Sequence, residues 1–171
     1  MNHTDATTNL DENDLDIIRE LEQNDEKNLE ELADELDLSK SAIHYRLNQL
    51  KDSGVIRNIS ADIDPHALGM SMVIITEVYV SHESGYADEI GDDLADLPGV
   101  QQVFYTMGDV DFMVVSRVQN HEQMNELIDE IVALEGVNET SSRFVMRELK
   151  DGNRLLETMS EGMVNRVLET E

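Results

Sequence analysis

Apolar residues recur every three to four positions in the first third of the chain, which is the spacing of one face of an α-helix. The pattern predicts three helices, at about Glu12–Gln23, Leu29–Leu36 and Lys40–Ser53. Asp11 and Ser39 are suited to cap the first and third helices, and Gly54 is suited to end the third. The break between the second and third helices is short, as in a helix-turn-helix.

Two short apolar stretches, Val55–Ile56 and Ile59–Ile63, follow the third helix and favour a hairpin. Together with the helices they predict a winged helix-turn-helix over residues 10–63. Asp64 precedes Pro65 and is therefore pushed out of helical geometry, so the first domain is expected to end there. Residues 1–9 are polar and are expected to be disordered.

The pattern then changes to alternating strands and amphipathic helices over residues 64–150. The expected elements are a strand at Met70–Val80, a helix at Tyr86–Leu97, strands at Val100–Met107 and Asp111–Val118, a helix at Glu122–Leu134 and a final strand, bulged in one reading, at Val137–Leu149. This β-α-β-β-α-β order is the ferredoxin-like arrangement, so the fold class is α+β. Residues 151–171 predict one further amphipathic helix, weakened by Gly162.

The strands of the second domain are apolar on both faces. In Met70–Val80, one alternating set holds Ile74 and Val78, and the opposite set holds Val73, Ile75 and Tyr79. One face packs on the two helices, so the other face is expected to pack on a second subunit. The sequence therefore predicts at least a homodimer and leaves tetramers and octamers open.

Composition narrows the class of protein further. The chain has 38 acidic and 12 basic residues, a net charge of −26 and no cysteine. These counts exclude a disulfide framework and a cysteine nucleophile, and no apolar run suits a membrane span, so a cytoplasmic protein is expected. Such acidity suits molar salt, where the Debye length is roughly 3 Å and surface charges repel weakly. An acidic ligand-binding surface is the alternative.

The motifs, taken in order, resemble the Lrp/AsnC family of transcriptional regulators, and specifically an acidic, salt-adapted (haloarchaeal-type) member. The resemblance runs from Leu10 to about Lys150. It rests on Leu10–Asp14 with Ile17 and Ile18, Glu31–Ala33 with Leu38–Ser41, Arg46–Leu47, Gly54–Ile56, Asp64–Pro65, Thr106 with Gly108 and Asp111, and Thr140 with Ser142. It implies a DNA-binding first domain and a second domain that assembles the oligomer and senses a metabolite.

The third helix is the candidate DNA-binding element. Residues 39–57 contain four basic residues and one acidic residue, whereas residues 25–37 contain seven acidic residues and one basic residue. A polyanionic partner explains why the acidity stops here. The candidate contacts to double-stranded DNA are Lys40, Ser41, His44, Tyr45, Arg46, Asn48 and Arg57. For Arg46 the alternative is a structural ion pair with an acid of the first or second helix.

The loop around Gly108 is the candidate effector site, on the strength of the resemblance. In the family this loop lies at a contact between dimers and helps to hold a small effector, often an amino acid. Asp111 would pair with an α-ammonium group, and the other candidate residues are Tyr105, Gly108, Asp109, Thr140 and Ser142. From sequence geometry alone, Gly108–Asp109 is an ordinary hairpin turn.

The sequence does not indicate an enzyme, a metal site or a cofactor. The five histidines have no ligand spacing, and no phosphate-binding glycine-rich loop occurs. Sirohaem decarboxylases resemble Lrp/AsnC proteins in both domains and carry histidine and basic residues after the first Gly-Val. Here Val100–Met107 has none, so this alternative is the weakest. A metabolite-sensing or oligomerisation protein without DNA binding is the other alternative.

Overall fold

The computed structural model describes residues 9–23, 27–81, 86–150, 152 and 154–169. The chain forms two compact units, one from residues 1–63 with 151–171 and the other from residues 64–150. The expected disorder of the N-terminus falls on residues 1–8, outside the described residues, and Asn9 is exposed. The α+β fold class predicted from sequence is confirmed.

The first unit contains three helices whose starts are fixed by local side chains: α1 (Glu12–Gln23), α2 (Leu29–Glu35) and α3 (Lys40–Asp52). Asp11 accepts from the Asp14 backbone N–H at 2.9 Å, and Asp14 accepts from the Asp11 N–H at 3.1 Å. Ser39 accepts from the Ala42 N–H at 3.1 Å, so both predicted caps are confirmed. Asn28 caps α2 in the same way, and its own backbone N–H donates to the Glu31 carboxylate at 2.9 Å.

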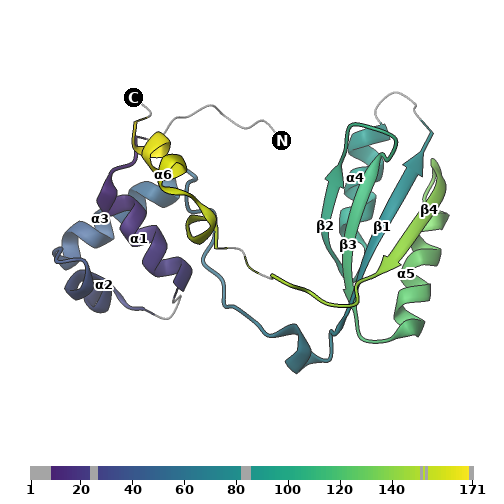
Figure 1. The fold of residues 1–171 in the computed structure, drawn as a ribbon, viewed down its shortest axis with the longest axis horizontal. Helices are drawn as coiled ribbons and strands as arrows, with labels where there is room; N and C mark the ends of the chain where they lie inside the picture. Colours follow the sequence, from purple (N-terminus) through teal and green to yellow (C-terminus); the bar gives the residue numbers. More distant parts are fainter. Residues whose placement is uncertain (1–8, 24–26, 82–85, 151, 153, 170–171) are drawn as a thin grey trace. The chain divides into compact units, whose positions relative to one another are not determined.

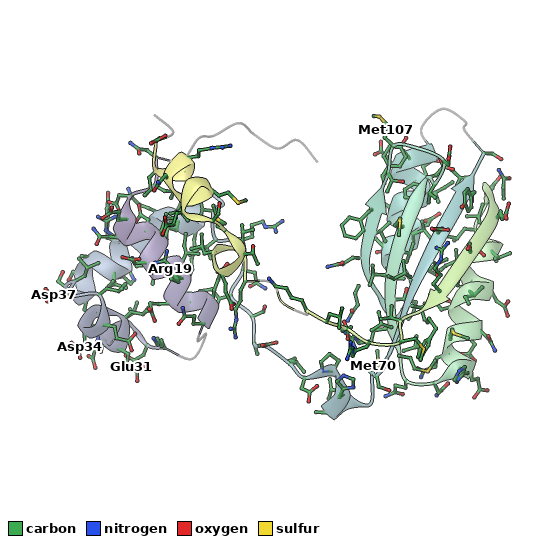
Figure 2. All side chains as sticks on the ribbon, in the orientation of Figure 1. Arg19, Glu31, Asp34, Asp37, Met70 and Met107 are labelled. Atoms are coloured by element: carbon green, nitrogen blue, oxygen red, sulfur yellow. The ribbon has the colours of Figure 1, made fainter. Side chains whose placement is uncertain are left out.

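The core of this unit is formed by the predicted apolar faces. Ile17, Leu32, Ile43, Leu47 and Leu50 are all buried against one another. The turn between α2 and α3 passes through Asp37 in the left-handed region, with φ of 51° (labelled in Figure 2). The Leu38 N–H donates to the Ala33 carbonyl at 3.0 Å, which closes the turn and sets the start of α3. The outward face of α3 is therefore fixed by the same packing.

The hairpin expected after α3 does not form among the described residues. Gly54 adopts φ of 78° as predicted for a helix end, and the Ile56 N–H donates back to the Leu50 carbonyl. Residues 57–64 carry no strand. The two residues between the apolar stretches, Arg57 and Asn58, do not include the glycine that favours a two-residue hairpin turn, and an isolated hairpin is only marginally stable.

The second unit begins with the short 3-10 helix η1 (Pro65–Leu68) and has the predicted β-α-β-β-α-β order. Its elements are β1 (Met72–Val80), α4 (Tyr86–Asp96), β2 (Val100–Tyr105), β3 (Phe112–Val118), α5 (His121–Ala133) and β4 (Val137–Phe144). The strands form one antiparallel sheet in the order β2-β3-β1-β4. A register shift opposite Tyr79–Val80 confirms the bulge in β4, which ends at Phe144, five residues before the predicted end.

Helices α4 and α5 cover one face of this sheet (Figure 1). The layer between the helices and the sheet is mainly apolar and contains Ile74, Val78, Val114, Leu94 and Ile131, each at most 1% exposed. Full burial of such a side chain contributes about 1.5–3 kcal/mol, so this layer is the main source of stability for the unit.

The C-terminal tail is broken into two pieces, where the sequence predicted one helix. These are η2 (Leu156–Thr158) and α6 (Glu161–Leu168). The break lies at Met159 and Ser160, which are both extended, and Ser160 then starts α6. Ser160 is the N-cap residue of α6, a position that serine favours over a helix interior, and its side chain makes no capping hydrogen bond here.

Candidate DNA-binding and effector sites

The outward face of α3 carries long polar side chains at helical spacing. Tyr45 is 62% exposed, and Ser41, His44, Asn48 and Gln49 are exposed as well. The Gln49 amide donates to the Tyr45 hydroxyl at 2.8 Å, and the Asn48 amide lies 3.3 Å from Nδ1 of His44. These two i,i+4 pairs order four side chains with hydrogen-bonding groups toward solvent.

Gln49 was missed by the sequence reasoning, although its spacing four residues after Tyr45 was readable. Of the predicted contacts, the structure brings Ser41, His44, Tyr45 and Asn48 together on the face opposite the buried Ile43 and Leu47. An exposed helix face with amide, imidazole and hydroxyl groups can reach base edges and phosphates in a major groove.

Of the four basic residues near this face, three are exposed and one, Arg46, is partly buried. Lys51 and Arg57 are exposed. Lys40 pairs with Glu30 at 2.5 Å, but both side chains are more than half exposed, so the pair is weak and phosphate can replace the carboxylate. The pairing lowers the pKa of Glu30 through its hydrogen bond to Lys40.

Arg46 has a different environment. Its Nη1 atom lies 2.7 Å from a carboxylate oxygen of Asp14 and 2.7 Å from one of Asp11. Its side chain is 25% exposed, and that of Asp14 is 13% exposed. These bonds, first to Asp14 and then to Asp11, raise the pKa of Arg46. The structure favours the alternative reading of Arg46, an ion pair that ties α3 to the start of α1.

A second cation links the helices of this unit. Lys27 forms ion pairs with Glu20 of α1 and Glu35 of α2. The hydrogen bonds to Glu20 and Glu35 raise the pKa of Lys27. Its role was not predicted, because the partners are seven and eight residues away in different helices. Lys27 and Arg46 thus hold the three helices in register in a strongly acidic chain.

The loop between β2 and β3 is held by internal bonds. The Asp111 carboxylate accepts from the Val80 N–H at 2.9 Å, and the residue is only 9% exposed. The Thr106 N–H donates to the Asp111 carbonyl at 2.8 Å. One oxygen of the Asp111 carboxylate thus already bonds to β1 inside the fold, and the expected pairing of this carboxylate with an α-ammonium group stays a prediction. Asp109 is exposed, and Gly108 adopts φ of 151°.

The other predicted effector residues lie on the two outer strands of the sheet. Tyr105 of β2 is opposite Phe112, Phe112 is opposite Val78, and Val78 is opposite Thr140 of β4. With three strand spacings between them, Tyr105 and Thr140 are about 14 Å apart in backbone position. Ser142 is already bonded to the buried Thr76 at 2.9 Å. One chain therefore does not bring the whole predicted set into one pocket.

The face of the sheet away from the helices is partly apolar, as predicted. It presents Val73, Ile75, Met113 and Val115, of which Val73 is 7% exposed and the others are half-buried. Glu77 and Arg143 form an ion pair of 2.5 Å on the same face, and the bond to Arg143 lowers the pKa of Glu77. At the end of the sheet, Met107 is fully exposed and projects into solvent (Figure 2).

Within the described ranges, no three histidine or acidic side chains cluster as metal ligands would. None of the helices described here combines the length and apolar character needed to cross a bilayer.

Comparison with known families matches both units. Residues 10–57 match the model of a winged helix-turn-helix DNA-binding domain, and residues 73–155 match that of the Lrp/AsnC ligand binding domain.

Individual relatives extend over most of the chain. The transcriptional regulator FL11 of Pyrococcus horikoshii is 36% identical over 146 residues, which cover 85% of this chain and 95% of the relative. The leucine-responsive regulatory protein of Escherichia coli is 28% identical, with 86% and 91% covered. Among solved structures, the L-Met complex of the regulator NMB0573 from Neisseria meningitidis is 24% identical. Its TM-score is 0.80, with 85% of this chain and 96% of that chain covered, and it supports the fold.

Proposed function

The chain belongs to the Lrp/AsnC family of transcriptional regulators, and we propose that it binds operator DNA through α3 as a dimer and senses a small metabolite. Regulation of transcription by a DNA-binding protein is the activity that the family shares with this chain. We propose in addition which residues contact DNA, which surface forms the dimer and which kind of effector binds.

One observation carries the DNA-binding assignment: α3 has a single acid, the exposed Asp52 at its last position, in a chain of net charge −26. By contrast, Glu31, Asp34 and Asp37 crowd the outer surface of α2 and the turn beside it (Figure 2). Acids on α3 would face phosphate, so their scarcity is expected of a helix that enters a DNA groove.

The contacts divide by reach and by charge. Ser41, His44, Tyr45 and Asn48, with Gln49, read base edges or phosphates from the exposed face of α3. Lys40 and Arg57 contact phosphates. Arg46 acts indirectly, by holding α3 in place.

A homodimer follows from the apolar open face of the sheet around Ile75, Met113 and Val115. An apolar face of this kind is salted out in concentrated electrolyte unless a second subunit covers it. Two-fold symmetry places two copies of α3 on half-sites about one helical turn apart. Tetramers or octamers built from such dimers are compatible with the same surface.

The effector is a small metabolite such as an amino acid. Support comes from the match to a ligand-binding domain, from the leucine-responsive name of one relative and from the L-Met complex of one structural neighbour. Asp109 and Gly108 at the β2–β3 turn, with Tyr105 nearby, form one part of the site. Thr140 and Ser142 form another, and the strand spacing between the two parts favours a site completed by a neighbouring subunit. Asp111 supports the loop.

The acidity itself is an adaptation to a salt-rich cytoplasm. Exposed carboxylates on α2 and its turn keep their hydration in molar salt while their mutual repulsion is screened over roughly 3 Å. In such salt, counterion release contributes little to DNA affinity, so base-edge contacts and multivalent binding carry more of it. Regulation of transcription requires no catalytic step, and we assign no enzyme activity.

The test is selection of a binding site from random duplexes in about 2 M KCl. A two-fold symmetric site, with weaker selection for Tyr45→Ala and Asn48→Ala, supports the proposal. Failure of the folded, dimeric protein to enrich any sequence would favour a sensor without DNA binding. Sedimentation in the same buffer gives the oligomer, and calorimetric titration with the twenty amino acids tests the effector.

A further inference from the structure

The Glu22 carboxylate of α1 binds the C-terminal tail. One oxygen of Glu22 accepts from the Leu155 N–H at 2.7 Å, and the other accepts from the Leu156 N–H at 2.9 Å. These two amides open η2, whose own first residue provides no side-chain cap. Glu22 therefore supplies, from another part of the chain, the acceptors that the first turn of a helix needs.

The tail also presents an apolar side to the unit that Glu22 belongs to. Five apolar residues spaced along one side of the tail are half-buried: Leu156, Met159, Val164, Val167 and Leu168. On α1, Leu15 is only 3% exposed, yet it lies outside the core cluster of α1–α3. Leu15 is two helical turns before Glu22 on the same face of α1, which is the face on which the tail is anchored.

Most of this tail lies beyond the part of the chain that the two family models match. The two family matches end at residues 57 and 155, and FL11 aligns over 146 of the 171 residues. The chain leaves the helical unit after Ile63, builds the sheet unit as far as Lys150, and returns to the helical unit with the tail (yellow in Figure 1). Two stretches of backbone therefore join the units.

We propose that the tail is a second tether on the DNA-binding unit, with Glu22 as its latch, and that it strengthens binding to paired half-sites. The proposal rests on the proposed function. A helical unit on one flexible connection loses orientational freedom when a dimer engages two half-sites, and that loss costs affinity. A latched second connection removes part of this freedom in advance and raises the effective concentration at the second half-site. The affinity of one helical unit for a single half-site is not changed by the second connection.

The experiment compares the full-length wild type with Glu22→Ala, and with Glu12→Ala as the matched control. Glu12 is an exposed acid of the same helix, so its loss changes charge equally and leaves the latch intact. Hydrogen exchange at the Leu155 and Leu156 amides reports the latch. Titration with duplexes that contain two half-sites or one half-site reports the tether.

Glu22→Ala is expected to exchange both amides about tenfold faster. It should bind the two-half-site duplex about tenfold more weakly and the single half-site as wild type does. Glu22→Gln, which keeps one acceptor oxygen, should be intermediate. If Glu22→Ala disturbs α1 by circular dichroism, Val167→Asp, which places a charge on the apolar side of the tail, replaces it.

Three results would overturn the tether. Unprotected amides in the wild type exclude the latch. Equal loss of affinity for both duplexes assigns Glu22 to the integrity of α1. Faster exchange with unchanged affinity for paired half-sites makes the tail a packing element only. If the wild type binds neither duplex, the proposed function and the tether fail together, while the exchange data still judge the latch separately.

Discussion

Replacing Arg46 by alanine separates a structural role from a DNA contact. The substitution removes the cation that pairs with Asp14 and Asp11 at 2.7 Å and leaves the Asp14 side chain, 13% exposed, without it. Exposed pairs contribute less than about 1 kcal/mol, and breaking a buried pair costs about 3–5 kcal/mol. Arg46, at 25% exposure, lies between these limits, so we expect a loss of about 2 kcal/mol in the free energy of unfolding.

For a unit of this size, about 2 kcal/mol corresponds to a fall of roughly 10 °C in Tm. Circular dichroism at high salt, with urea or heat, measures the loss. A double-mutant cycle with Asp14→Ala should recover a coupling energy of about 1–2 kcal/mol. The dependence of DNA affinity on KCl concentration tests the role as a DNA contact. Each lost phosphate contact lowers the slope of log affinity against log salt concentration by about one.

Arg57→Ala is the matched control, because Arg57 is an exposed arginine of the same unit. It should reduce the salt slope by about one and leave stability within about 0.5 kcal/mol of wild type. Arg46→Ala should lower the free energy of unfolding and leave the salt slope of DNA binding unchanged. Arg46 is a DNA contact and not a structural residue if Arg46→Ala is as stable as wild type and lowers the salt slope as Arg57→Ala does.

Three further predictions concern stability, measured by urea denaturation. Gly54→Ala should lower the free energy of unfolding by about 1 kcal/mol, because of its φ of 78° alone. Gly99→Ala should lower it by about 2–3 kcal/mol, because φ is 86° and the new Cβ would lie 3.0 Å from a backbone oxygen. Equal losses for the two variants would contradict this geometry. Ile131→Ala, at a site with 0% exposure, should cost about 3 kcal/mol, and Val132→Ala, at 54% exposure, less than about 0.5 kcal/mol. The pKa of Glu77 lies below its usual value of 4.5, because Arg143 bonds to its carboxylate. The stability that this ion pair adds to the fold is therefore fully present above pH 4.5 and is lost as the pH falls through the folded-state pKa. Glu77→Gln should remove that part of the acid dependence, and an unchanged profile would exclude it.

Local signals accounted for most of the fold. The caps at Asp11 and Ser39 and the glycine at the end of α3 act within a few residues, so the helix bounds were readable to within one or two positions. The β-α-β-β-α-β order of elements followed from alternating strands and amphipathic helices. The hairpin after α3 and the single tail helix were wrong, because short apolar stretches fix a strand or helix only when packing or pairing supports them.

The sites were less readable, since they depend on which strands and helices become neighbours. Periodicity gave the exposed face of α3 correctly. It did not show that Arg46 meets two acids of α1, nor that the Asp111 carboxylate is used by Val80. Likewise, Tyr105 and Thr140 are separated by the whole width of the sheet, although both are polar positions near one end of it.

The most direct test of the central claim is binding to the DNA upstream of the protein's own gene in about 2–3 M KCl, against unrelated competitor DNA. We predict specific binding that persists in this salt and is lost when Tyr45 and Asn48 of the exposed α3 face are both replaced by alanine, with the fold unchanged. No specific binding between about 0.5 and 3 M KCl by a folded protein would contradict it, as would binding that is indifferent to α3.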